Sequence, residues 1–152
     1  MSEEQQQPTF AIEKIYLKDA SVEVPNAPQI YLSRETPQVD VQIHTQGNSV
    51  DEGIFEVVVT VTVTAKVEGE KTMFLVEAGQ AGVFTLRNIP QTDLEPILGV
   101  TCPNILFPYV REVVSDLVSR AGFPPVILSP VNFEAMYAQN HAQADEGAGT
   151  TH

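Results

Sequence analysis

Residues 55–68 read FEVVVTVTVTAKVE, in which apolar and polar side chains alternate. Every odd position from 55 to 67 is apolar, and most even positions carry threonine or a charge. A period of two residues, built largely from β-branched side chains, predicts a long β-strand with one buried face and one solvated face. The chain is therefore expected to fold around a sheet that is covered on one side.

Neighbouring segments supply partners for this strand. GEK at 69–71 is a turn signal, and the run TMFLVEAGQAGVF after it predicts the second strand of a hairpin. Residues 39–43 alternate in the same way. Residues 10–24 predict a fourth strand with an irregular phase, so a bend or bulge is expected near Lys14. Between these last two strands, PNAPQIYLSRETPQ is too long for a tight turn and predicts a crossover loop.

Helical periodicity replaces the strand pattern towards the C-terminus. TDLE at 92–95 matches a capping box and predicts a short helix, which Gly99 is expected to interrupt. A longer helix is expected from Pro103 to a C-terminal cap at Gly122, and a last helix after SPVN at 129–132. We therefore expect an α+β fold: a four-stranded antiparallel sheet with a long crossover loop, followed by C-terminal helices packed on one face.

A single domain accounts for the chain. Its 152 residues, 43% of them hydrophobic, suit one modest core. The domain is expected to span residues 9–138, with disordered segments at residues 1–8 and in the small, polar tail 139–152. No apolar stretch approaches the roughly 20 residues of a membrane span, and MSEEQQQPTF lacks the basic and apolar regions of a secretory signal. We expect a cytoplasmic protein without direct membrane insertion.

The charge of the chain narrows the range of partners. Twenty acidic residues against eight basic ones give a net charge of −12. Such a chain repels nucleic acid and anionic membranes, so we expect neither as a partner. It attracts basic segments of other proteins, although acidity that only keeps the protein soluble explains the same composition.

The long predicted helix is apolar over more of its surface than one sheet can cover. At about 100° per residue its apolar side chains span roughly half the circumference, whereas packing on one sheet needs an arc only a little above ~100°. These side chains are Leu106, Phe107, Tyr109, Val110, Val113, Val114, Leu117 and Val118. The excess predicts a second apolar contact, and we therefore expect an oligomer.

Catalytic and metal chemistry find little support. Cys102 is the sole cysteine, which excludes internal disulfides and cysteine-based zinc clusters. A helix start can activate a thiol, but no histidine stands in a known signature with this one, and lone cysteines are commonly buried and inert. His44 and Asp40 share a strand face without a third ligand. We expect no catalytic residue, no metal site and no cofactor, and we place Cys102 in the core.

Two surface features remain. Asp19 and Glu23 share one face of the first strand, and Leu75 and Glu77 share one face of the fourth, so these four residues form an acidic patch if the strands are neighbours. A solvated sheet face would show the same pattern. The crossover loop and the last helix carry apolar and aromatic side chains, which either bind varied apolar sequences or pack in the core.

Three stretches carry a resemblance to a known family. They are CPNILFPYVREVVSDLVSRAGFPPVILSPVNF at 102–133, VEVPNAPQI at 22–30 and EVVVTVTVTA at 56–65, and they closely resemble the SecB family of protein-export chaperones. The resemblance runs from about Thr9 to Tyr137 and implies a cytosolic homotetramer, a dimer of dimers, without cofactor or ATPase activity. It also implies a holdase that binds unfolded precursor proteins and delivers them to the SecA motor for export. A chaperone of a toxin–antitoxin system is the alternative within the family.

The same resemblance implies roles for particular residues. A basic, zinc-containing C-terminal segment of SecA, which holds the zinc itself, is expected to bind Asp19, Glu23, Leu75 and Glu77. A client groove is expected between crossover loop, second strand and last helix, lined by Tyr31, Leu32, Val39, Val41, Ile43, Phe133, Met136 and Tyr137. The oligomer interface is expected at Leu106, Tyr109, Val110, Val113 and Leu117. This chain lacks the tryptophan that the crossover loop of some members carries. An enzyme built on Cys102 and a carrier of a small apolar ligand are the competing classes.

Overall fold

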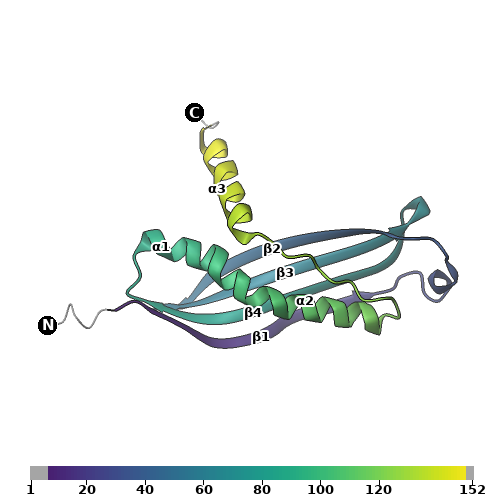
Figure 1. Cartoon of the computed structure of the whole chain (residues 1–152), viewed down its shortest axis with the longest axis horizontal. Helices are drawn as coiled ribbons and strands as arrows, with labels where there is room; N and C mark the ends of the chain where they lie inside the picture. The colour runs from purple at the N-terminus through teal and green to yellow at the C-terminus, as the bar shows by residue number, and fades with distance from the viewer. Residues whose placement is uncertain (1–6, 150–152) are drawn as a thin grey trace.

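The computed structural model describes the backbone of residues 7–149 and the side chains of residues 7–141. Four strands form one antiparallel sheet in the order β1-β4-β3-β2 (Figure 1). Their bounds are Thr9–Glu23 for β1, Gln38–Asp51 for β2, Ile54–Val67 for β3 and Lys71–Arg87 for β4. Short 3-10 turns lie in the crossover loop (η2, Gln29–Leu32) and between β3 and β4 (η3, Glu68–Glu70). The predicted sheet and crossover loop are confirmed.

The alternation in β3 places one complete row of side chains in the core. Val57, Val59, Val61 and Val63 all have 0% exposure, whereas the intervening residues are partly exposed on the opposite face. Both neighbours of β3 are present, since β4 and β2 pair along nearly its whole length. The strand that the sequence marks most clearly is therefore one of the two central strands of the sheet.

Two irregularities in β1 explain its uneven phase. The register against β4 shifts between Ile12 and Lys14, and again between Leu17 and Asp19. The first shift lies where a bulge was predicted, and the second was not anticipated. Each shift inserts one residue and so moves the following side chains to the other face. The larger aliphatic residues of β1 and Phe10 consequently stay on the helix-covered face, and Asp19 is moved to the outer face.

The helical part differs in two details from its prediction. Its elements are α1 (Gln91–Pro96), the π-turn η4 (Ile97–Thr101), α2 (Cys102–Arg120) and α3 (Phe133–Gly149). The capping-box prediction is wrong: the Pro90 carbonyl accepts the first N–H groups, from Asp93 at 2.9 Å and Leu94 at 3.1 Å, so Thr92 is already inside α1. Gly99 does not end the helix, because η4 continues through it into α2.

The three elements from Gln91 to Arg120 run together and are, by length and composition alone, apolar enough to cross a membrane. No single apolar run marks this segment in the sequence, because polar residues interrupt its apolar ones. Its buried side packs on the sheet, where Leu106, Val110, Val114 and Val118 have 0% exposure at a spacing of four residues. This packing is typical of the core helix of a globular domain.

The ends of the domain differ from the prediction on one side. Helix α3 continues through residues 139–149, a segment expected to be disordered. Alanine, glutamine and glutamate are good helix formers, so this polar stretch has the propensity for a helix without an apolar face. The start of α3 agrees with the prediction, since the Asn132 side chain accepts the Ala135 N–H at 3.0 Å. Most of the predicted disordered N-terminus, and residues 150–152, lie outside the described residues.

Candidate functional site

The four residues of the acidic patch come together on the outer face of the sheet, opposite α2. Strands β1 and β4 are neighbours, and Glu23 pairs with Leu75, Ser21 with Glu77 and Asp19 with Gly79. Asp19 and Glu23 are exposed, and Leu75 and Glu77 are half-buried. The condition that sequence analysis set for an acidic patch is therefore met.

Among the described residues, the carboxylates of this patch have no basic partner. Within the part of the chain that the structure describes, no Lys, Arg or His forms an ion pair with Asp19, Glu23 or Glu77. Glu77 is held in place by Thr62, whose hydroxyl donates to Glu77 Oε1 at 2.8 Å. Unpaired carboxylates on a flat face leave a negative potential that favours a basic partner.

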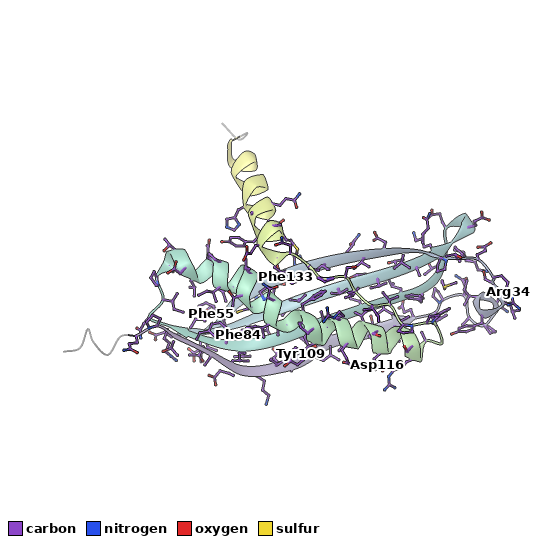
Figure 2. The ribbon with its side chains drawn as sticks, viewed as in Figure 1. Arg34, Phe55, Phe84, Tyr109, Asp116 and Phe133 are labelled. Atoms are coloured by element: carbon purple, nitrogen blue, oxygen red, sulfur yellow. The ribbon has the colours of Figure 1, made fainter. Side chains whose placement is uncertain are left out.

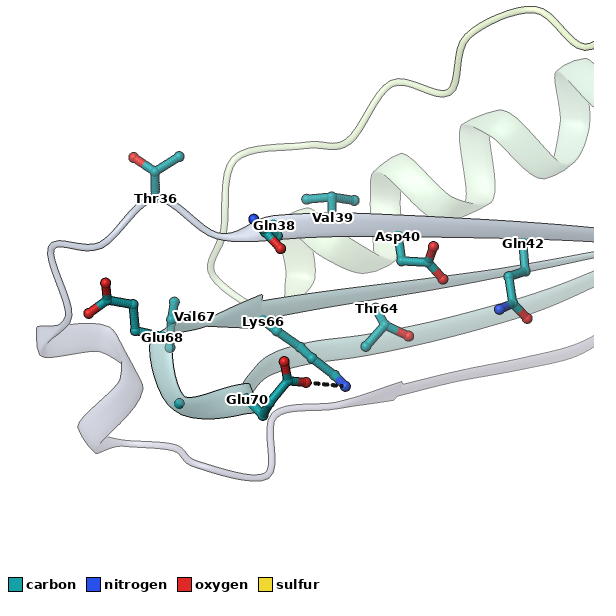
Figure 3. Close-up of a pocket in the computed structure, with 11 residues that line it drawn as sticks. Thr36, Gln38, Val39, Asp40, Gln42, Thr64, Lys66, Val67, Glu68 and Glu70 are labelled. Atoms are coloured by element: carbon teal, nitrogen blue, oxygen red, sulfur yellow. Dashed lines mark hydrogen bonds and ion pairs between the residues drawn. The ribbon is translucent and has the colours of Figure 1, made fainter.

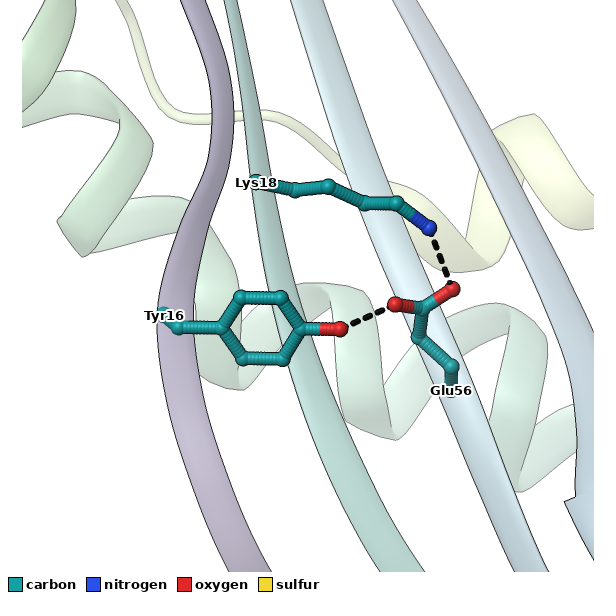
Figure 4. Close-up of polar contacts among 3 residues, drawn as sticks. All are labelled: Tyr16, Lys18 and Glu56. Carbon is teal, nitrogen blue, oxygen red and sulfur yellow. Dashed lines mark hydrogen bonds and ion pairs between the residues drawn. The ribbon is translucent and has the colours of Figure 1, made fainter.

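A polar cluster lies beside the patch on the same face (Figure 4). Tyr16 and Lys18 reach from β1 across β4 to Glu56 on β3: the Tyr16 hydroxyl donates to Glu56 Oε2, and Lys18 Nζ lies 2.8 Å from Glu56 Oε1. The hydrogen bond from Lys18 is the main cause that lowers the pKa of Glu56, and the bond from Tyr16 adds to it. The same bond to Glu56 is the main cause that raises the pKa of Tyr16 to about 12. The positive charge of Lys18 is thus balanced by Glu56 and does not reduce the negative charge of the acidic patch.

Glu56→Gln is expected to lower the free energy of unfolding by about 1 kcal/mol at neutral pH. Because folding lowers the pKa of Glu56, its contribution is present above the ordinary value of 4.5 and is lost as the pH falls through the folded-state value. The difference between wild type and variant should therefore shrink below about pH 4.5. Urea unfolding between pH 3.5 and 7.5 measures it, with Glu52→Gln in an exposed turn as the control. A constant difference across this range would contradict the assignment.

The other face of β2 presents an uncovered apolar strip. Val39 is 47% exposed and Val41 40% exposed, and Ile43 is half-buried, because α2 packs mainly over β4 and β3. Leu32 in the crossover loop is 80% exposed. Exposed apolar side chains in a row on one strand are a surface on which apolar segments can bind. Three predicted groove residues, Val39, Val41 and Ile43, make up this strip, and two more, Tyr31 and Leu32, are exposed in the crossover loop.

Two predicted groove residues have structural contacts of their own. Tyr31 stacks on Phe123, with ring centroids 5.2 Å apart, and its hydroxyl donates to the Ala121 carbonyl at 2.7 Å. It thereby fastens the crossover loop to the end of α2. Phe133 is only 2% exposed and meets Phe107 edge to face at 5.7 Å (Figure 2). The prediction that Phe133 lines an open groove conflicts with this burial, since periodicity cannot tell a core aromatic from a surface one. Met136 and Tyr137 are half-buried at the base of α3.

The predicted interface residues divide in the same way. Leu106 and Val110 have 0% exposure and point at the sheet of their own chain, so they cannot touch a second subunit directly. Tyr109 is exposed on α2, and Val113 and Leu117 are half-buried on its flank (Figure 2). Sequence analysis did not separate the two groups because both belong to one wide apolar arc.

A further hollow of about 720 Å³ opens on the outer face where β2 and β3 meet the crossover loop (Figure 3). Its lining is mostly polar and includes the ion pair of Lys66 Nζ and Glu70 Oε2 at 3.1 Å. The lining residues are Thr36, Gln38, Val39, Asp40, Gln42, Thr64, Lys66, Val67, Glu68, Gly69 and Glu70. Val39 borders both the hollow and the apolar strip, and the other β2 residues of the lining, Gln38, Asp40 and Gln42, lie on the face of β2 opposite the strip.

Cys102 lies in the core, as predicted. It has 0% exposure, and burial raises the pKa of its thiol to about 12, so the reactive thiolate is strongly disfavoured at neutral pH. Among the residues that the structure describes, no three His, Cys, Asp or Glu side chains gather as metal ligands.

Comparisons with known proteins identify the family. A family model described as preprotein translocase subunit SecB matches residues 3–144. The chain is 61% identical to protein-export protein SecB of Nitrosospira multiformis, over 97% of this chain and 92% of that protein. It is 63% identical to the protein of the same name from Chromobacterium violaceum, over 96% of this chain and 97% of that one.

A solved structure supports the fold independently. The SecB-like chaperone Rv1957 of Mycobacterium tuberculosis, in complex with a ChAD peptide from the HigA1 antitoxin, superposes with a TM-score of 0.66 at 20% identity. The match covers 80% of this chain and 90% of that one. With the family model matching nearly the whole sequence and relatives above 60% identity, the chain belongs to the SecB family of protein-export proteins.

Proposed function

We propose that this protein is an ATP-independent chaperone that holds unfolded precursor proteins in the cytoplasm and delivers them to SecA for export. Membership of a protein-export family supports the general role. The observation that carries the proposal is the apolar strip on β2, which a folded chain leaves open at the cost of exposing Val39, Val41 and Leu32 to water. The toxin–antitoxin alternative is not favoured, because relatives at 61–64% identity are named protein-export proteins.

An unfolded client would be held by many weak apolar contacts that act together. An unfolded client exposes scattered apolar segments, each of which contributes about 25 cal/mol per Å² of apolar area buried on the strip. Several strips on one oligomer raise the effective concentration of the next contact, so avidity grows without sequence specificity. A client that folds hides these segments and leaves, and slow-folding clients consequently stay bound longest.

Assembly into a tetramer, a dimer of dimers, would supply those repeated strips. Support comes from apolar side chains of the edge strand β1 that α2 leaves open: Phe10, Ile12, Leu17 and Val22 are all more than a third exposed. Tyr109 on α2 is exposed as well. A second copy that covers these residues would give the additional apolar contact predicted from the wide arc of the helix.

Delivery to SecA would use the acidic patch on the opposite face. Three unpaired carboxylates beside Leu75 suit a basic peptide segment with an apolar contact. The zinc of that segment belongs to the partner, and the described residues of this chain form no group of three metal-type ligands. Client and motor would thus occupy opposite faces of the sheet at the same time.

Native mass measurement with and without a denatured, slowly folding precursor tests the proposal. We expect a mass of four times the 16.6 kDa chain, and a complex with client under native conditions. Val41→Asp should weaken client binding about tenfold, since it places a charge in the strip, whereas Gln46→Asp on the outer face of the same strand should not. A stable single chain that ignores the denatured precursor would refute the proposal.

A further inference from the structure

Gly99 is in close contact with an aromatic ring. A side chain at position 99 would clash with this ring in its present position. Gly99 lies in the middle of the π-turn η4, between α1 and α2. A Cβ atom at Gly99 would lie 2.5 Å from Cδ1 and 2.8 Å from Cε1 of Tyr137, distances that real Cβ contacts do not reach. The ring of Tyr137 therefore rests directly on the backbone of η4. Glycine is required here for close approach, which explains why a residue that usually ends helices stands inside this one.

The next turn of α3 is tied to the same helical joint. Tyr137 packs against His141, with ring centroids 4.1 Å apart, and His141 Nε2 lies 3.7 Å from Glu95 Oε2 on α1. Below them, Phe133 is buried against Phe107 of α2. The described contacts of α3 thus run along the joint of α1, η4 and α2, and the helix rises away from the sheet (Figure 1). Its direction depends on a few side chains near its base.

The π-turn also touches β2, the strand that carries the apolar strip. Leu98 of η4 lies beside Gly47 of β2, where an added Cβ would be 3.8 Å from the Leu98 Cβ. The turn therefore stands between α3 on one side and β2 on the other. From Ile43, the last residue of the strip, to Gly47 the strand extends about 13 Å at ~3.3 Å per residue, so η4, with α3 seated on it, lies towards this end of the strip. Met136 and Tyr137 at the base of α3 are half-buried.

We propose that Gly99 and Tyr137 form a seat that sets the direction of α3 relative to β2, and that Gly99 is a positioning residue for client binding. The inference rests on the proposed chaperone function. With the seat intact, α3 closes one end of the apolar strip in a single orientation. Without it, α3 samples many orientations, and only a fraction of chains presents a complete strip. Apparent affinity falls in proportion to the competent fraction.

The decisive variant is Gly99→Ala, compared with Gly47→Ala. Both add one methyl group near η4, but only the first meets the Tyr137 ring; at Gly47 the nearest atoms are 3.8 Å away. We expect Gly99→Ala to weaken binding of a denatured precursor about tenfold if one chain in ten stays competent, and Gly47→Ala to leave it within twofold. Tyr137→Ala removes the ring and should broaden the distribution of α3 positions as Gly99→Ala does.

Spin-label distances report the position of α3 without any client. Labels at Asn140→Cys on α3 and Gln46→Cys on β2, both exposed, are introduced with Cys102→Ser and diluted into unlabelled protein. We expect one narrow distance distribution in wild type and a broad one in Gly99→Ala. The double variant Gly99→Ala/Tyr137→Ala removes the clash, so it should regain thermal stability while its distribution stays broad and its client binding stays weak.

The outcomes separate the two proposals. A narrow distribution in Gly99→Ala overturns the seat, and a broad one with unchanged client affinity overturns its role in binding. Recovery of client binding in the double variant would attribute the loss to strain and would also overturn that role. If the wild-type protein binds no denatured precursor, the chaperone function fails and the positioning role fails with it, whereas the distance data still decide whether the seat exists.

Discussion

Phe84→Ala is expected to lower the free energy of unfolding by about 4 kcal/mol, the middle of the range for truncating a core aromatic residue. Phe84 has 0% exposure, and its ring lies over Gly82, where an added Cβ would be 2.8 Å from ring atom Cε2. The Phe84 ring therefore also occupies the space where a side chain of residue 82 would lie. Leu106 of α2 closes the site from above, with Cδ2 3.1 Å from the same position. Alanine would leave a cavity that a rigid strand pair cannot close.

Urea unfolding at one fixed protein concentration measures this loss, because the stability of an oligomer depends on concentration. Val50→Ala serves as the control: Val50 is exposed near the β2–β3 turn, and the change should cost less than about 0.5 kcal/mol. Equal unfolding midpoints for Phe84→Ala and Val50→Ala would show that the core is not organised around this ring.

Asp19→Lys combined with Glu77→Lys is expected to weaken binding of the basic C-terminal segment of SecA by about a hundredfold or more. Each change removes an attraction and adds a repulsion, on a patch where the structure shows no ion pair to these carboxylates among the described residues. Binding by wild type should weaken as salt rises, since the Debye length falls from about 10 Å at 0.1 M to 3 Å at 1 M. The remaining affinity of the variant should depend less on salt.

Calorimetry with a synthetic basic, zinc-loaded peptide provides the measurement. Glu52→Lys with Glu68→Lys is the matched control, because it changes the net charge equally in two exposed turns away from the patch. Client holding should be unaffected in both double variants, since the strip lies on the other face. Equal losses of peptide binding in the two would mean that net charge, and not the patch, attracts SecA.

The sequence by itself determined the elements whose signals are local. The alternation at 55–68 became β3 with its buried row of valines, and the apolar arc after Pro103 became α2. Both elements were predicted from a spacing of apolar residues that repeats along the whole element, and the tertiary packing buries the same residues. The acidic patch was half-determined: each strand showed its carboxylates on one face, but only the sheet order β1-β4-β3-β2 brings Asp19 next to Glu77.

Tertiary structure alone decided the features that join distant segments. Glu56 meets Tyr16 and Lys18 because β4, which is later in the sequence, lies between β1 and β3. Phe133 was placed in the groove by its type, yet the ring of Phe107 buries it. Gly99 was predicted to end a helix from its propensity, whereas the ring of Tyr137 requires a glycine there. The sequence pattern around a residue indicates its secondary structure and which face of the element it occupies. Which side chains it contacts on that face depends on how distant segments of the chain pack together.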